Sequence, residues 1–235
     1  GSPAEALIGQ AVVCEINNSC LAYGRQDTCE ACRRGLPTHC LRRTVTGIIG
    51  HPGAFGQYLR VPAGNVHPIP EGLPLDAAVL VEPLAAAIRT FELTELREDD
   101  IVVVLGCGRL GRMVALVAGR TGARVVAVGR SEEHLTRIAP WCWKRIRLSR
   151  GDGEDEQDLS DVPTVRNHEE LRSAILDLTG GLGADVVVEA TGVNDNLKLA
   201  QTLVRPMGTV AMKSTSGVPV SGLDTTRATV DELRF

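Results

Sequence analysis

The feature that most constrains the fold is a run of five branched apolar residues, Ile-Val-Val-Val-Leu at 101–105, followed directly by Gly106-Cys107-Gly108-Arg109-Leu110-Gly111. A continuous apolar run suits a strand that is buried on both faces of a parallel sheet. The closely spaced glycines suit a tight turn out of that strand, and residues 110–121 have helical periodicity. A strand, a glycine-rich turn and a helix in this order predict an α/β fold.

The same alternation continues along the chain. Strands are expected at 124–128, 164–165, 185–189 and 209–212, and helices at 132–138, 169–178 and 196–203. Strands that alternate with helices pair in parallel, because each helix returns the chain to the same end of the sheet. We therefore predict a doubly wound parallel sheet of the Rossmann type over residues 73–235. Two helices are expected to open this domain, one capped by Asp76 and one starting at Pro83 and ending near Leu93.

Residues 1–72 have a different character. Short segments rich in β-branched residues, at 7–16 and 57–61, are separated by Gly and Pro. This pattern predicts a loop-rich β domain whose boundary with the sheet domain falls between residues 72 and 73.

Residues 140–160 interrupt the regular alternation. They contain Trp141-Cys142-Trp143, a basic pair and an acidic run at 152–158, with no clear period. We interpret the segment as an irregular surface insertion, with a regulatory or partner-binding role as the alternative. Both ends of the chain are expected to be internal to a longer protein, since the sequence does not begin with Met and residues 230–235 resemble a strand that has just begun.

The glycine-rich turn predicts dinucleotide binding. Gly106 permits the tight turn, Gly108 lets the backbone approach a pyrophosphate, and Gly111 lets the helix pack closely on the strand. Backbone N–H groups around Arg109 and Leu110 open the helix, whose N-terminus favours negative charge. The alternative is a tight strand-to-helix turn without a ligand.

The end of the second strand indicates which dinucleotide is preferred. A carboxylate at this place would accept hydrogen bonds from the ribose of NAD, whereas an arginine would pair with the 2′-phosphate of NADP. The sequence here is Gly129-Arg130-Ser131, and the acidic residues come later. Gly129 is expected to leave room for the phosphate, Arg130 to bind it and Ser131 to add a hydroxyl, so NADP is favoured over NAD. The alternative is a solvated Arg130 with Ser131 serving as a helix N-cap.

Four of the seven cysteines, Cys20, Cys29, Cys32 and Cys40, lie close together in the sequence. An odd total and this clustering favour a metal over disulfides, and four thiolates complete a tetrahedral zinc shell that leaves no open position. His39 could replace Cys40, and Cys14 could replace Cys20. The alternative is a loop of free thiols.

Charge and hydropathy exclude other classes. The chain has 29 acidic and 25 basic residues, whereas nucleic-acid binding needs a clustered basic excess, so a zinc-ribbon nucleic-acid binder is disfavoured. No apolar run reaches the roughly 18 to 20 residues that cross a bilayer, and the first residues do not form a secretory signal, so the cytoplasm is the expected location.

Several segments stand in the order found in a known family. They are Cys29-x2-Cys32-x7-Cys40, Gly53-Ala54-Phe55-Gly56, Glu82-Pro83-Leu84-Ala85, the glycine-rich turn and Asp185-Val186-Val187-Val188-Glu189-Ala190-Thr191-Gly192. Together they resemble the medium-chain dehydrogenase/reductase superfamily, in particular its zinc-dependent alcohol, polyol and threonine dehydrogenases. The resemblance implies that residues 1–72 are part of a GroES-like catalytic domain with a structural zinc lobe.

The resemblance also implies roles for particular residues. The four cysteines match the zinc lobe, with a longer gap after Cys20, and Glu82 matches a position at the catalytic zinc of polyol dehydrogenases. The turn Ala190-Thr191-Gly192 corresponds to the nicotinamide end of the cofactor site. The first catalytic zinc cysteine and the Gly-His-Glu segment of the family would precede this sequence, and neither His51 nor His67 occupies a ligand position.

The implied function is hydride transfer between a secondary alcohol or polyol and NADP. The expected partners are a small alcohol or carbonyl substrate and, among macromolecules, further copies of the same chain. An alternative on the same fold is a catalytically inactive NADPH-binding or zinc-stabilised interaction module.

Overall fold

A computed structural model describes residues 5–149, 162–215 and 217–235. The chain forms two compact units, Gly1–Glu82 and Pro83–Phe235, which are described separately. The expected boundary between residues 72 and 73 lies before this division, because helix α2 (Leu75–Ala78) and the start of α3 (Val81–Leu93) group with the first unit. None of the described helices combines the length and apolarity needed to span a bilayer.

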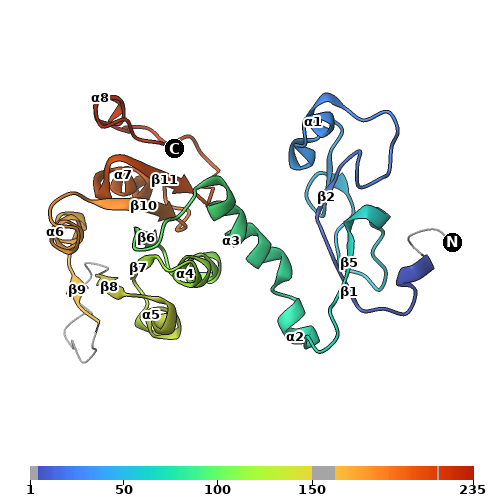
Figure 1. Ribbon diagram of the computed structural model, residues 1–235, viewed down its shortest axis with the longest axis horizontal. Coiled ribbons are helices and arrows are strands. Elements are labelled where there is room, and N and C mark those ends of the chain that lie inside the picture. Colours follow the sequence, from blue (N-terminus) through green and yellow to red (C-terminus); the bar gives the residue numbers. More distant parts are fainter. Residues whose placement is uncertain (1–4, 150–161, 216) are drawn as a thin grey trace. The chain divides into compact units, whose positions relative to one another are not determined.

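The second unit is built on a six-stranded sheet in the order β11-β10-β6-β7-β8-β9 (Figure 1). Its strands are β6 (Ile101–Leu105), β7 (Arg124–Gly129), β8 (Lys144–Leu148), β9 (Thr164–Val165), β10 (Ala184–Glu189) and β11 (Val204–Met212). Every pairing in this sheet is parallel. The predicted doubly wound α/β fold is therefore confirmed.

Helices cover both faces of the sheet. They are α3, α4 (Arg109–Arg120), α5 (Glu132–Arg137), α6 (His168–Leu178), α7 (Asn194–Leu203) and α8 (Thr225–Val230). Alternate residues of β6 enter different cores: Val103 packs in the cluster that contains Leu171 of α6, whereas Val102 and Val104 pack in the cluster that contains Leu135 of α5. All five of these side chains are fully buried. Burial on both faces explains why the strand sequence is continuously apolar.

Two expectations for this unit need correction. Residues 144–148 are not irregular; they form β8, in which Ile146 is buried and pairs with Val128 of β7. The segment has only two apolar residues, Ile146 and Leu148, which is too short a pattern to indicate a strand without its pairing partner. The acidic run at 152–158 lies outside the described residues.

The last residues were expected to begin a strand. The structure has α8 up to Val230, after which Arg234 forms a parallel bridge to Thr209 and its N–H donates to the carbonyl of Gly208 at 3.0 Å. The expectation therefore holds for the bridge at Arg234 and was wrong for the helical residue Val230.

The first unit contains short strands joined by loops, as predicted. They are β1 (Val12–Cys14) paired antiparallel with β5 (Val66–Pro68), and a three-stranded sheet of β2 (Asn17–Asn18), β3 (Thr44–Thr46) and β4 (Gly50–His51). The remaining elements are α1 (Glu30–Arg33), α2 and the 3-10 turns Glu5–Leu7, Pro37–His39 and Ala63–Asn65. Buried Asn65 joins the strands, because its side-chain amide donates to the carbonyls of Glu15 and Asn17 and to Asn18 Oδ1.

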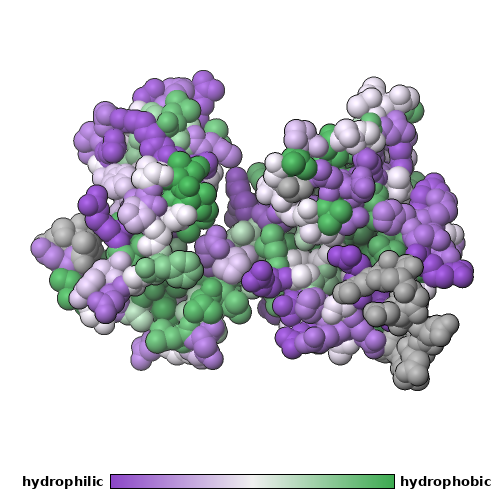
Figure 2. All heavy atoms as spheres, turned by 180° about the vertical axis from the view of Figure 1, so that it is seen from behind, coloured by the Kyte–Doolittle hydropathy of each residue, from purple (hydrophilic) through white to green (hydrophobic). Residues whose placement is uncertain are grey.

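Two local predictions in this unit were wrong. Residues 57–61 form no strand, and the Tyr58 side chain is almost fully exposed. Val61 is the one β-branched residue of this segment, and no other strand pairs with it. Asp76 does not cap α2, which begins one residue earlier after Pro74; its carboxylate instead accepts from the Ala77 N–H at 2.9 Å. Other exposed apolar side chains of this unit include Ile48, Phe55 and Val79. Figure 2 shows hydrophobic areas on the surface of the molecule.

Candidate zinc lobe and dinucleotide site

The four predicted cysteines come together in the first unit. Their sulfurs all lie within 4.8 Å of one another, with Sγ of Cys40 at 3.5 Å from that of Cys20 and 3.6 Å from that of Cys29. A tetrahedron with Zn–S bonds of about 2.3 Å has edges of roughly 3.8 Å, so the sulfur set matches zinc. Neither Cys14 nor His39 belongs to this group, which is the single cluster of three or more such ligands among the described residues.

Local backbone geometry places the sulfurs. Cys29 precedes α1 and Cys32 lies within it, so one helical turn carries both thiols. The Leu41 N–H donates to Cys29 Sγ and the Arg42 N–H to Cys40 Sγ, each at 3.4 Å. The backbone N–H of Cys32 is the main cause that lowers the pKa of Cys29 to about 6, whereas burial raises the pKa of Cys32 to about 11. Donors directed at sulfur suit thiolates that bind a cation.

Arg42 contacts the cluster from outside, and sequence reasoning missed it. Its Nη1 donates to Asp27 Oδ2 at 2.7 Å, and its Nη2 donates to the Asp27 carbonyl. Hydrogen bonds to Asp27 and then to the Cys20 thiol raise the pKa of Arg42. Asp27 belongs to the long gap between Cys20 and Cys29, so that gap supplies the residue that orients Arg42.

The second unit holds a cavity of about 480 Å³ at the carboxyl ends of the central strands. Ligands of doubly wound sheets bind at this edge, where the strand order reverses. The cavity brings together six of the predicted cofactor residues: Gly106, Gly108, Arg130, Ser131, Ala190 and Thr191. The predicted Arg109, Leu110 and Gly111 do not line this cavity, and Gly192 lines a neighbouring one.

The three glycines of the turn meet different constraints. A Cβ on Gly106, whose φ is +94°, would lie 2.7 Å from Thr191 Cγ2, and one on Gly111 would lie 1.7 Å from the Gly106 carbonyl oxygen. A Cβ on Gly108 would meet no atom within 4 Å. Gly106 and Gly111 are therefore required by packing, while Gly108 leaves open space beside the helix N-terminus for a ligand. This open space fits a pyrophosphate.

The wall of this cavity beyond β7 contains basic side chains. Arg130 is exposed at the end of β7, His134 and His168 also line the cavity, and no Asp or Glu occurs among its described lining residues. Sequence reasoning missed the two histidines. The signal for His134 was its position in the first turn of the helix that Ser131 caps. A lining without carboxylates suits a 2′-phosphate better than a free ribose hydroxyl pair.

Gly129 and Ser131 line the cavity and each also has a structural role. A Cβ on Gly129 would lie 3.2 Å from both Cβ and Sγ of Cys107, so this glycine also leaves space for a buried neighbour. Ser131 is the N-cap of α5, with its Oγ accepting from the His134 N–H at 3.3 Å. The hydroxyl still lines the cavity and can donate its proton to a ligand.

A second cavity, of about 320 Å³, adjoins the first through Val193, which lines both. Glu189 lines it from the end of β10 with only 5% of its surface exposed. This buried carboxylate stood in the motif that carried the family resemblance, yet we assigned it no role from sequence.

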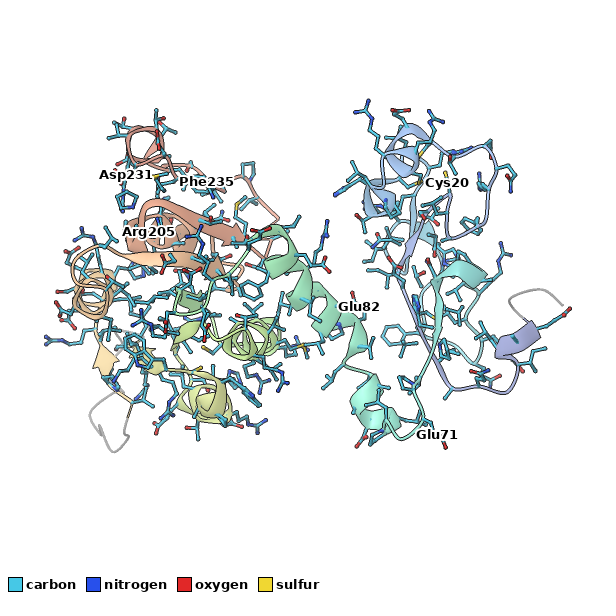
Figure 3. The ribbon with its side chains drawn as sticks, in the orientation of Figure 1. Cys20, Glu71, Glu82, Arg205, Asp231 and Phe235 are labelled. Atoms are coloured by element: carbon cyan, nitrogen blue, oxygen red, sulfur yellow. The ribbon has the colours of Figure 1, made fainter. Side chains whose placement is uncertain are left out.

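The candidate catalytic Glu82 lies on α3 with an exposed side chain and does not join the cysteine cluster (Figure 3). His51 Nδ1 lies 2.9 Å from the Pro52 carbonyl, and His67 is exposed on β5. Within the described parts of the chain, none of these three residues takes part in a group of three or more metal-binding side chains.

Comparison with known proteins identifies both units. The alcohol dehydrogenase GroES-like domain matches residues 2–71, and the NAD-binding domain of 3-hydroxyacyl-CoA dehydrogenase matches residues 101–232. The chain is 30% identical over 206 residues to L-threonine 3-dehydrogenase of Bacillus licheniformis, covering 83% of this chain and 54% of that protein. It is also 30% identical to erythritol/L-threitol dehydrogenase of Mycolicibacterium smegmatis, over 77% of this chain and 46% of that protein.

Among solved structures, alcohol dehydrogenase TADH from Thermus sp. ATN1 is similar, with a TM-score of 0.77 and 28% identity. The match covers 97% of this chain and 61% of the Thermus chain. The chain thus spans about half the length of the curated relatives that it matches.

Proposed function

The chain belongs to the medium-chain dehydrogenase/reductase superfamily. On that premise we propose that it forms part of an oxidoreductase that transfers hydride between a secondary alcohol or polyol and NADP. The observation that carries the preference for NADP is the cavity at the end of β7, which Arg130 lines and no described carboxylate lines. The threonine and polyol dehydrogenases among the relatives support a small hydroxylated substrate.

In this proposal the residues of the second unit bind and orient the cofactor. Gly108 admits the pyrophosphate against the N-terminus of α4, where backbone N–H groups and the helix dipole favour its charge. Arg130 pairs with the 2′-phosphate, and the Ser131 hydroxyl donates to it. The turn at Thr191 and Gly192 borders the nicotinamide, which supplies the hydride chemistry when it is bound.

In the first unit, Cys20, Cys29, Cys32 and Cys40 would hold a structural zinc ion, because four thiolates leave no position for substrate. All seven cysteines are free, which agrees with a reducing compartment and supports a cytoplasmic location.

The cofactor preference is testable by binding. We expect NADPH to bind at least about tenfold more tightly than NADH, because a charge-assisted pair contributes about 1.5–3 kcal/mol. Titration with both cofactors, followed by nicotinamide fluorescence, measures the ratio, and Arg130→Ala should reduce it to near one. Arg137→Ala is the matched control, since Arg137 is an exposed arginine of α5 that pairs with Glu133 at 2.6 Å outside the cavity. Equal affinities in the wild-type chain, or a ratio unchanged by Arg130→Ala, would contradict the proposal.

A second candidate is a module that binds NADPH without turnover. It is favoured because the one ligand cluster among the described residues is a closed set of four cysteines, while Glu82 stands alone. An open catalytic zinc site needs about three protein ligands, and one exposed carboxylate does not retain the ion. We expect the 235-residue chain to oxidise no secondary alcohol at a detectable rate with NADP and added zinc. Zinc-dependent turnover that Glu82→Ala abolishes would contradict this expectation and direct attention to His51 and His67.

A further inference from the structure

Glu189 is a buried carboxylate of the second unit that the proposed function leaves unused. It ends β10 and is 5% exposed. Its Oε1 accepts hydrogen bonds from the Thr191 N–H at 2.7 Å and from the Thr191 hydroxyl, and its Oε2 accepts one from the Ser214 hydroxyl. A carboxylate buried to this extent is costly unless such donors compensate it, so the arrangement is a specific one.

The hydrogen bonds extend from Glu189 to the rest of the turn. Thr191 Oγ1 donates to Glu189 and accepts from the Val193 N–H at 3.1 Å and the Asn196 side-chain amide at 2.9 Å. Ser214 Oγ donates to Glu189 and accepts from the Gly192 N–H at 2.8 Å. The backbone N–H groups of Thr191, Gly192 and Val193 are therefore satisfied either by the carboxylate or by hydroxyls that it orients.

This turn is the wall between the two cavities. Thr191 lines the larger cavity, Gly192 and Ser214 line the smaller one, and Val193 lines both. The larger cavity contains the glycine-rich turn and Arg130, which leaves the smaller one for the end of the cofactor farthest from its 2′-phosphate.

We propose that Glu189 is a positioning residue that holds the turn 190–193 and Ser214 in the conformation that receives the nicotinamide half of the cofactor. This inference rests on the proposed dinucleotide function. The carboxylate suits the role because it offers two acceptor oxygens to three converging donors, whereas an amide presents one acceptor oxygen and an opposing N–H₂ group. Aspartate keeps the charge but is one methylene shorter.

The test uses two ligands that differ in the nicotinamide half. NADPH occupies the whole site, whereas adenosine 2′,5′-bisphosphate carries the adenosine with its 2′- and 5′-phosphates and lacks the nicotinamide half. We expect Glu189→Gln to raise the Kd for NADPH by about tenfold to a hundredfold, the range that corresponds to hydrogen bonds to a charged group, and to change the Kd for the bisphosphate by less than about twofold. Both constants can be measured by calorimetry on the full chain.

Gln201→Ala is the matched control. Gln201 is also a buried polar residue of the same unit, 3% exposed, and it bonds the backbone of Asp224 but lines neither cavity. It should lower thermal stability without separating the two ligands. If Glu189→Gln does not fold, Thr191→Val and Ser214→Ala test the same network by removing one hydroxyl each, and each should weaken NADPH binding selectively by a smaller factor.

The outcomes separate this inference from the function on which it rests. A wild-type chain that binds neither ligand contradicts both. A wild-type chain that prefers NADH contradicts the NADP preference alone, and NADH with adenosine monophosphate then replaces the ligand pair. If the variants weaken both ligands of a pair equally, or weaken neither, Glu189 is a merely structural residue and the inference is wrong.

Discussion

The zinc lobe and the parallel sheet are stabilised by different means. In the lobe, the buried cluster consists of Cys20, Cys32 and Cys40, with Cys29 packed against it and no larger apolar side chain within it. In the sheet unit, fully buried aliphatic side chains from strands and helices fill two extensive clusters on the two faces. Order in the first region should therefore depend on a metal ion, and order in the second on burial of apolar surface. The following predictions test this difference between the two regions.

Removal of the metal should have the largest effect. Zinc binding contributes on the order of 10 kcal/mol to the folding of small zinc domains, so a strong chelator should unfold the lobe and leave the sheet unit folded. The chain offers a separate probe for each region, because both tyrosines, Tyr23 and Tyr58, lie in the first unit and both tryptophans, Trp141 and Trp143, lie in the second. Tyrosine fluorescence should change on chelation while tryptophan fluorescence stays constant.

Metal analysis completes this prediction. We expect one zinc ion per chain, lost in Cys32→Ser and retained in Cys142→Ser, whose cysteine lies outside the cluster. Two zinc ions per chain, or a Cys32→Ser variant that keeps its metal, would show that the assignment of ligands is wrong.

Truncation of a buried leucine in the sheet unit should have the next largest effect on stability. Leu171 of α6 is fully buried, and truncation of such a leucine costs about 2–5 kcal/mol. Leu171→Ala should lower the urea midpoint followed by tryptophan fluorescence and should leave the zinc content unchanged. Leu182→Ala is the control, because Leu182 is 58% exposed in the same unit. Loss of zinc from Leu171→Ala would mean that the two regions do not fold independently.

The smallest effect is expected at the edge of the lobe. Arg42 bonds Asp27 and the Cys20 thiol, and loss of such outer contacts to a metal ligand lowers metal affinity by about tenfold to a hundredfold. Arg42→Gln should show this loss in competition with a chromogenic chelator. Arg34→Gln should not, since Arg34 pairs with Glu30 on the exposed side of α1. Equal zinc affinities of the two variants would mean that Arg42 does not support the metal ligands.

Local patterns in the sequence predicted much of the fold. The apolar run of β6, the glycine-rich turn and α4 are adjacent in the chain, so periodicity and glycine spacing were enough to place them. β8 was missed because residues 144–148 contain only two apolar residues among three basic ones, too short a pattern to indicate a strand, and their strand conformation comes from pairing with β7. Residues 57–61 were expected to form a strand from their composition, but no other strand pairs with them.

The site shows the same division. The sequence identified Cys29 and Cys32 as a metal-binding pair because they lie on one turn of chain. It identified the glycines because each is needed by the backbone conformation or packing of residues close to it in the chain. It did not show that Gly129 also lies close to Cys107, which comes much earlier in the sequence. It offered the ligand contact and the helix cap of Ser131 as alternatives, and in the structure the helix cap and the cavity lining coincide in that residue.

By itself, then, the sequence determined the α/β class, the glycine-rich turn, the cysteine set and the absence of an acidic residue directly after β7. Each of these depends on residues that are close along the chain, where side-chain period and backbone freedom decide the outcome. Only the tertiary structure showed that Cys20 and not Cys14 joins the other three sulfurs, that Arg42 interacts with Cys20, and that Glu189 accepts from Ser214, 25 residues away. The physical reason is that these contacts satisfy buried polar groups, and the partner of a buried polar group is chosen by the packing of the whole unit, not by its neighbours in the sequence.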